Sequence, residues 1–231
     1  MYDLIDDIMA QKVSMVFKEN FETLINHKEN IEKIPGDIVE CGCWRGGFSI
    51  FLSKMFPQKN IWASDSFQGF QPLSYAKHDY KNERHTPLMS HNSFGPLAIS
   101  FEETYNNFID YGLQQDIENG RIQFLQGYVQ DTTNPETCKI ENIALLRIDV
   151  DAYSATLEVL NNLYNKVSPG GYIIFDDSCL RECRDAIRSF FTNNSMNTPL
   201  YHPTKDIHLD VFSSYTKDDS GFPPGCFIIK P

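Results

Sequence analysis

The sequence predicts an α/β fold: a mostly parallel sheet with helices on both faces and an antiparallel strand near the C-terminus. Short apolar runs alternate along the chain with segments whose apolar residues recur at helical spacing. The run at 143–149 is almost continuously apolar, as strands buried on both faces of a parallel sheet require. The length of 231 residues suits one such domain, so we expect a single domain over 1–231.

The expected elements follow in order along the chain. Amphipathic periodicity over 2–30 predicts one or two helices, which form an N-terminal helical region over 1–33. The segment Ser168-Pro-Gly-Gly171 predicts the end of the helix before it. The remaining expectations are strands at 37–41, 60–67 (ending on Asp65), 121–127, 143–149, 172–177, 207–215 and 226–230, and helices at 46–56, 100–113, 157–167 and 180–193.

The segment 68–98 is polar, has no clear period, and contains three prolines and three histidines. Long irregular stretches in compact domains are often lids or binding loops, so we expect a lid-like insertion here. Its histidines, His78, His85 and His91, lack the spacing of metal ligands and are expected to be solvated. One of them remains an alternative to the acidic residues as a catalytic base.

Composition restricts the function classes. The net charge is −11, which disfavours a nucleic-acid partner and is compatible with a small neutral or cationic ligand and with a divalent metal. The sequence contains no run of about 18 apolar residues, so we expect no membrane span. The acidic N-terminus lacks a secretory h-region, so we expect no signal peptide. The six cysteines are scattered, which favours reduced thiols and a cytoplasmic location. The sequence does not determine the oligomeric state, and a homo-oligomer is one alternative.

A glycine-rich turn follows the strand at 37–41. Glu40, Gly42 and Gly46 fit the pattern E-x-G-x-x-x-G, and Asp65 ends the next strand. Glycine lets a ligand approach the backbone, and an acid at the second strand can accept both hydroxyls of a ribose. This pair is the common arrangement of class I S-adenosylmethionine-dependent methyltransferases. The expected cofactor-binding residues are Glu40, Gly42, Asp65, Ser66, Phe67, Gly127, Tyr128 and Asp149.

Several residues in or near these motifs have a structural role as the alternative to a role in the site. Phe67 is either an adenine neighbour or a core residue. Trp44 and Arg45 either cover the cofactor or pack on the first helix. Arg147, inside a buried strand, is expected to be a paired core arginine rather than a catalytic group.

Four acidic residues follow two strands that we expect to be neighbours. Asp149 and Asp151 end one strand, and Asp176 and Asp177 end the next. Adjacent strands lie about 4.8 Å apart, so these carboxylates gather at one edge of the sheet and would repel one another without a cation. A hard ion such as Mg²⁺ prefers oxygen ligands. We expect Asp149, Asp176 and Asp177 as metal ligands, and Asp151 or Asp149 as the base.

Four blocks in order resemble the macrocin O-methyltransferase family: GDIVECGCWRGG, WASDSFQGF, LLRIDVDAYSAT and LYNKVSPGGYIIFDD. The resemblance covers roughly residues 34–190. It implies an enzyme with a class I (Rossmann-like) methyltransferase fold that uses S-adenosylmethionine and Mg²⁺ to methylate a hydroxyl of a sugar or glycosylated metabolite. Two alternatives remain: a methyltransferase of catechol-type aromatic diols that uses the same acids, and a non-catalytic protein that binds S-adenosylmethionine.

Overall fold

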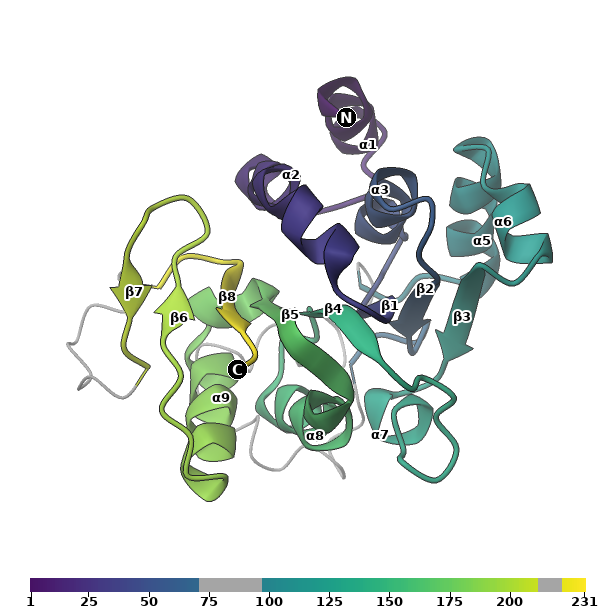
Figure 1. The fold of residues 1–231 in the computed structure, drawn as a ribbon. Coiled ribbons are helices and arrows are strands. Elements are labelled where there is room, and N and C mark those ends of the chain that lie inside the picture. Colours follow the sequence, from purple (N-terminus) through teal and green to yellow (C-terminus); the bar gives the residue numbers. More distant parts are fainter. Residues whose placement is uncertain (71–96, 212–221) are drawn as a thin grey trace.

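The computed structural model describes residues 1–70, 97–211 and 222–231. Within these ranges the strands form one sheet of order β3-β2-β1-β4-β5-β8-β6-β7 (Figure 1). Pairing is parallel from β3 to β5 and antiparallel where β8 joins β5 and β6, and between β6 and β7. The bounds are β1 Asp37–Cys41, β2 Ile61–Asp65, β3 Ile122–Gln126, β4 Ile143–Ile148, β5 Val167–Phe175, β6 Leu200–Tyr201, β7 His208–Leu209 and β8 Cys226–Ile229.

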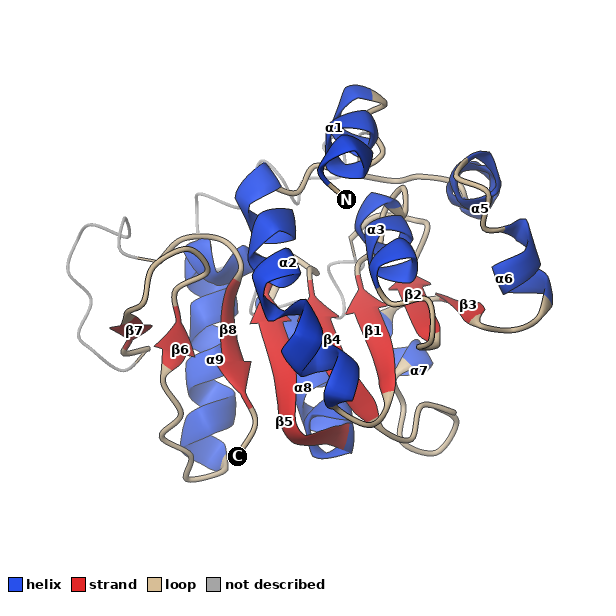
Figure 2. Ribbon diagram, turned by 45° about the horizontal axis from the view of Figure 1, so that its top comes forward, coloured by secondary structure: helices blue, strands red, loops and turns tan. Residues whose placement is uncertain are grey.

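Helices cover both faces of this sheet, which confirms the expected α/β architecture (Figure 2). One face carries α1 (Tyr2–Ala10), α2 (Lys18–Lys33), α3 (Gly47–Met55), α5 (Phe101–Asp110) and α6 (Gln114–Glu118). The other face carries α7 (Val129–Thr132), α8 (Tyr153–Leu163) and α9 (Arg181–Asn193). None of the described helices combines the length and apolar composition needed to cross a bilayer.

The alternation of side chains along the strands produces a hydrophobic core on each side of the sheet. In β4, Leu145 belongs to the core under α1, α2 and α3, whereas Leu146 belongs to the core under α8 and α9. Every residue of β4 is buried. Because Arg147 is two residues beyond Leu145, its side chain lies on the α3 side of the sheet, at the level where the strands end.

Some boundaries differ from the expected ones. The helix predicted to reach residue 167 ends at Leu163, and Val167 instead begins β5 by pairing with Ile143. β5 ends at Phe175, so Asp176 and Asp177 lie in a 3-10 turn, η2 (Asp176–Cys179), rather than on the strand. The short helices α6 and α7 were not expected, because segments this short carry little periodicity.

Two expectations concern residues that the structure does not describe. Most of the predicted insertion over 68–98, including His78, His85 and His91, lies outside the described ranges. The end of the predicted strand at 207–215 also lies outside them, and its described part contains β7.

Candidate functional site

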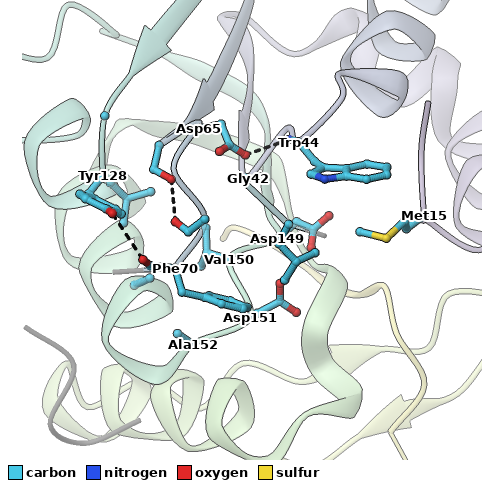
Figure 3. A pocket seen from close by; sticks show the side chains of 16 residues that line it. Met15, Gly42, Trp44, Asp65, Phe70, Tyr128, Asp149, Val150, Asp151 and Ala152 are labelled. Atoms are coloured by element: carbon cyan, nitrogen blue, oxygen red, sulfur yellow. Dashed lines mark hydrogen bonds between the residues drawn. The ribbon is translucent and has the colours of Figure 1, made fainter. Parts of the chain in front are cut away.

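Two adjoining pockets open at the carboxyl ends of the parallel strands, where open α/β sheets bind ligands. Figure 3 shows the first of them. The first pocket contains Asp65, Ser66 and Tyr128 in its lining and holds about 830 Å³ of empty space, including solvent at its mouth. The second pocket is lined by Glu40, Arg147, Asp176, Asp177 and other residues. Both pockets share the residues Met15, Gly42, Trp44, Phe70, Leu97, Asp149 and Asp151.

The turn after β1 requires glycine at position 42. Gly42 has a φ of +92°, and a Cβ there would lie 1.6 Å from the backbone oxygen of Asp149. The backbone N–H groups of Gly42 and Cys43 both donate to the Ser64 oxygen, at 2.8 and 3.0 Å. The turn is thus pressed against the ends of β2 and β4. Its bare backbone forms part of both pockets, as the sequence pattern predicts.

Asp65, at the end of β2, holds the two segments that flank the first pocket. Its Oδ2 accepts from the Trp44 N–H and its Oδ1 accepts from the Phe67 N–H, both at 2.8 Å. Both donor residues have positive φ, +48° for Trp44 and +55° for Phe67. Burial raises the pKa of Asp65, and the backbone hydrogen bonds oppose that shift. Each carboxylate oxygen keeps further acceptor capacity toward the pocket.

The other expected cofactor residues divide into two groups. Ser66, Gly127 and Tyr128 line the first pocket, and the Tyr128 hydroxyl donates to the Phe70 oxygen at 3.4 Å. Phe67 does not line either pocket, because its ring packs edge-on against Phe101 at 5.3 Å between centroids. The Phe67 side chain is therefore a core residue, which was one of the two expected alternatives. Its backbone N–H donates to Asp65.

Residues around Trp44 join the turn to the N-terminal segment. Trp44 lines both pockets, and the Arg45 guanidinium lies 4.6 Å from the centre of its ring. Arg45 also donates to the Lys12 oxygen at 3.2 Å. Met15, which sequence reasoning missed, lines both pockets although its side chain is largely exposed. Its one signal was an apolar residue in the segment that joins two amphipathic helices.

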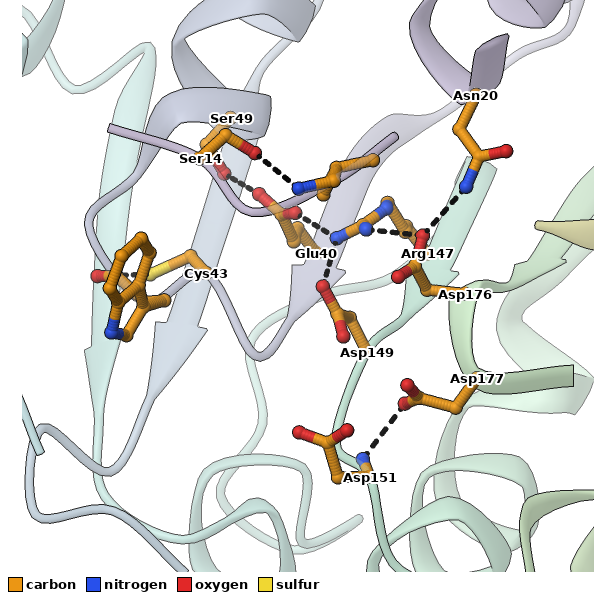
Figure 4. Close-up of polar contacts among 12 residues, drawn as sticks. Ser14, Asn20, Glu40, Cys43, Ser49, Arg147, Asp149, Asp151, Asp176 and Asp177 are labelled. Carbon is orange, nitrogen blue, oxygen red and sulfur yellow. Dashed lines mark hydrogen bonds and ion pairs between the residues drawn. The ribbon is translucent and has the colours of Figure 1, made fainter. Parts of the chain in front are cut away.

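Beneath the second pocket, Arg147 is buried among three carboxylates (Figure 4). Its Nη1 lies 2.5 Å from Glu40 Oε1 and 2.8 Å from Asp149 Oδ2, and its Nη2 lies 2.6 Å from Asp176 Oδ1. Ser49 donates to the other oxygen of Glu40. Glu40, expected to contact the cofactor, is 1% exposed and is engaged by these two residues. Arg147 is the paired core arginine that the sequence predicts.

Three acidic side chains converge where the two pockets meet. The ligand oxygens of Asp149, Asp151 and Asp177 all lie within 4.8 Å of one another, and Asp177 Oδ2 accepts from the Asp151 N–H at 2.8 Å. Burial and the Asp149 charge raise the pKa of Asp151 to about 7, and burial raises the pKa values of Asp149 and Asp177 well above their usual range. Carboxylates held this close together repel one another, so some of them bind protons unless a cation neutralises their charge.

The spacing of this cluster fits a divalent cation. Oxygen ligands about 2.1–2.5 Å from such an ion lie within about 4–5 Å of one another. The cluster differs by one member from the expected set of Asp149, Asp176 and Asp177. Asp151 has a φ of +56°, and its backbone N–H faces Asp177, while the Oδ1 of Asp176 is contacted by Arg147 and by Asn20, the latter at 3.2 Å.

The turn that carries Asp176 and Asp177 is tied to the C-terminal segment. The Gly225 N–H donates to the oxygens of Phe175 and Asp176, both at 3.0 Å. The Ser178 hydroxyl donates to the Pro223 oxygen at 2.6 Å and accepts from the Cys226 N–H at 3.1 Å. The antiparallel strand β8 therefore helps to fix the position of these acids.

The sheet order, the glycine turn after β1 and the acid that ends β2 together define a class I methyltransferase fold. The family model for macrocin-O-methyltransferase (TylF) matches residues 4–214. The chain belongs to this family, which confirms the resemblance seen in its sequence blocks.

Named relatives agree with this assignment. The chain is 36% identical over 162 residues to the mycinamicin III 3''-O-methyltransferase of Micromonospora griseorubida, covering 68% of this chain and 61% of that protein. It is 37% identical over 192 residues to the demethyldecarbamoylnovobiocin O-methyltransferase of Streptomyces niveus, covering 80% and 70%. The solved structure of the O-methyltransferase NovP superposes with a TM-score of 0.74 at 30% identity, covering 94% of this chain and 81% of that one.

The match to the first of these relatives spans less than two thirds of that protein's length. The same holds for a Streptomyces olivaceus O-methyltransferase named for a rhamnosyl-tetracenomycin, which is matched over 62% of its length at 34% identity.

Proposed function

We propose that this chain is an S-adenosylmethionine-dependent and Mg²⁺-dependent O-methyltransferase that acts on a hydroxyl of a sugar or glycosylated small molecule. The observation that carries the proposal is the meeting of the two pockets at Asp149 and Asp151. One pocket has the glycine turn and Asp65, and the other has the acidic cluster. A relative whose name specifies a rhamnosyl-tetracenomycin supports the choice of acceptor.

The first pocket is suited to the cofactor. Asp65 offers acceptor oxygens to the ribose hydroxyls, the Gly42 turn allows close approach, and Ser66, Gly127 and Tyr128 complete the wall. S-adenosylmethionine would supply the methyl group. Trp44 and Met15 line both pockets at their junction. Exclusion of water from this junction would favour a reaction in which a sulfonium charge is lost.

The second pocket is suited to the metal and the acceptor. Asp149 and Asp177 belong both to the expected ligand set and to the observed cluster, and the third oxygen comes from Asp151 or Asp176. A divalent cation held there would supply Lewis acidity, which lowers the pKa of an acceptor hydroxyl. Asp151 lies where both pockets open, and we assign it, with Asp149 as the alternative, the removal of the hydroxyl proton.

Three measurements test this function. Calorimetry should detect S-adenosylhomocysteine binding, and a screen of sugar, glycoside and catechol acceptors should detect methyl transfer that chelation abolishes. Turnover with catechols alone would replace the acceptor class, and turnover that survives exhaustive chelation would remove the metal. Binding without turnover on any diol would favour the non-catalytic alternative.

Asp151→Asn should lower kcat without rescue by excess Mg²⁺, and a normal kcat in this variant would assign the base elsewhere.

A further inference from the structure

Arg147 touches two acids of the site in the same way. One of its nitrogens contacts Asp149 only through Oδ2, and another contacts Asp176 only through Oδ1. In the described ranges of the chain no residue bonds Oδ1 of Asp149 or Oδ2 of Asp176. The guanidinium thus occupies one oxygen of each carboxylate and leaves the other toward the second pocket, which both acids line.

The sheet register explains why one arginine reaches both acids. Glu40 of β1 is the direct neighbour of Arg147 on β4, and Ile174 of β5 is its neighbour on the other side. Asp149 and Asp176 each follow a member of that row by two residues, just beyond the ends of β4 and β5, and both lie within reach of the Arg147 side chain. A planar guanidinium with separate nitrogens can span this row, whereas a single ammonium cannot.

Arg147 is itself held rigidly. Its side chain is 1% exposed, its Cζ lies 4.2 Å from the centre of the Phe48 ring, and Glu40 is fixed in turn by Ser49. Asn20 of α2 donates a hydrogen bond to the same oxygen of Asp176. The base of the second pocket is therefore a fixed frame from which two carboxylate oxygens project.

We infer that Arg147 is a positioning residue for the cation site: it fixes Asp149 and Asp176 so that one oxygen of each faces the ion. This inference rests on the proposed function, because it presupposes the divalent cation and takes Asp176, the expected ligand, as the source of the third oxygen. Partners that orient metal ligands typically change metal affinity about 10–100-fold when they are replaced. A residue that only stabilises the core would not change metal affinity selectively.

The test is Arg147→Lys, which keeps the positive charge beside Glu40 but removes the fork. Mg²⁺ affinity measured by calorimetry should fall about tenfold or more, while S-adenosylhomocysteine affinity stays within about twofold. The electron paramagnetic resonance spectrum of bound Mn²⁺ should also change. Arg121→Lys is the matched control, because it makes the same exchange at the Asp116 ion pair, where Arg121 Nε lies 2.8 Å from the carboxylate. It should leave both affinities unchanged.

Asn20→Ala provides a second variant if Arg147→Lys does not fold. It removes a hydrogen bond from Asp176 without disturbing a buried charge, and it should weaken Mg²⁺ binding about threefold. Unchanged Mg²⁺ affinity and Mn²⁺ spectra in a folded Arg147→Lys protein would overturn the inference, as would unchanged Mg²⁺ affinity in Asn20→Ala. A wild-type protein that binds neither Mg²⁺ nor Mn²⁺ would instead refute the metal dependence in the proposed function.

Discussion

Replacing Asp65 by alanine should affect stability and cofactor binding separately. The carboxylate accepts the backbone N–H groups of Trp44 and Phe67, and both of these residues have positive φ. Hydrogen bonds to a charged acceptor contribute about 1.5 kcal/mol or more each, so losing both should lower the free energy of unfolding by about 3 kcal/mol. For a chain of this size the Tm should fall by about 6–12 °C.

Cofactor binding should fall for a different reason. If the remaining acceptor capacity of Asp65 takes two ribose hydroxyls, losing those contacts removes about 3 kcal/mol of binding free energy. The affinity for S-adenosylhomocysteine, measured by calorimetry at a temperature where the variant is fully folded, should then fall about 100-fold. Affinity within about threefold of the wild type would refute the assignment of Asp65 to the ribose.

Asp37→Ala is the matched control for this experiment. Asp37, at the opposite end of β1, accepts from Trp62 Nε1 at 2.8 Å and from Asn60 Nδ2 at 3.0 Å. This variant also loses two hydrogen bonds to a carboxylate, so its Tm should fall, but its S-adenosylhomocysteine affinity should not change. Equal losses of affinity in the two variants would mean that reduced stability, and not a lost contact, weakens binding.

Three other predictions follow from the structure. Gly42→Ala should abolish S-adenosylhomocysteine binding and lower the Tm, because its Cβ would collide with the Asp149 backbone; calorimetric affinity equal to the wild type would contradict this. Asp177→Asn should weaken Mg²⁺ binding at least tenfold, with turnover partly restored by excess Mg²⁺; wild-type metal affinity would exclude Asp177 as a ligand. Burial lowers the pKa of His27 below its unfolded value, so the unfolded chain binds a proton more readily and stability contributed by neutral His27 is lost as pH falls below about 6.5. Urea unfolding at about pH 7 and pH 5 should therefore show a larger loss of stability for the wild type than for His27→Phe, and equal losses would remove His27 as the cause.

The sequence was sufficient to predict the mostly parallel sheet and most of its strands. The apolar run of β4 and the acid at the end of β2 depend on local pattern, and both occur where expected. The closeness of Asp151 to Asp149 and Asp177 could not be predicted, because it depends on a positive φ at Asp151 and on contacts between the ends of two strands. Met15 was missed because its place at the pockets results from contacts between segments far apart in the chain.

The hydrogen bonds between the Asp176 turn and residues 223–226 affect when the site can form during synthesis. β8 is inserted between β5 and β6, although β6 precedes it in the chain. While the ribosome is still translating residues before 222, the edge of β5 is unpaired and the turn bearing Asp176 and Asp177 lacks its partners at Pro223 and Gly225. A nascent chain can thus complete its glycine turn and Asp65 early, but it acquires the acidic half of the site only after β8 has emerged.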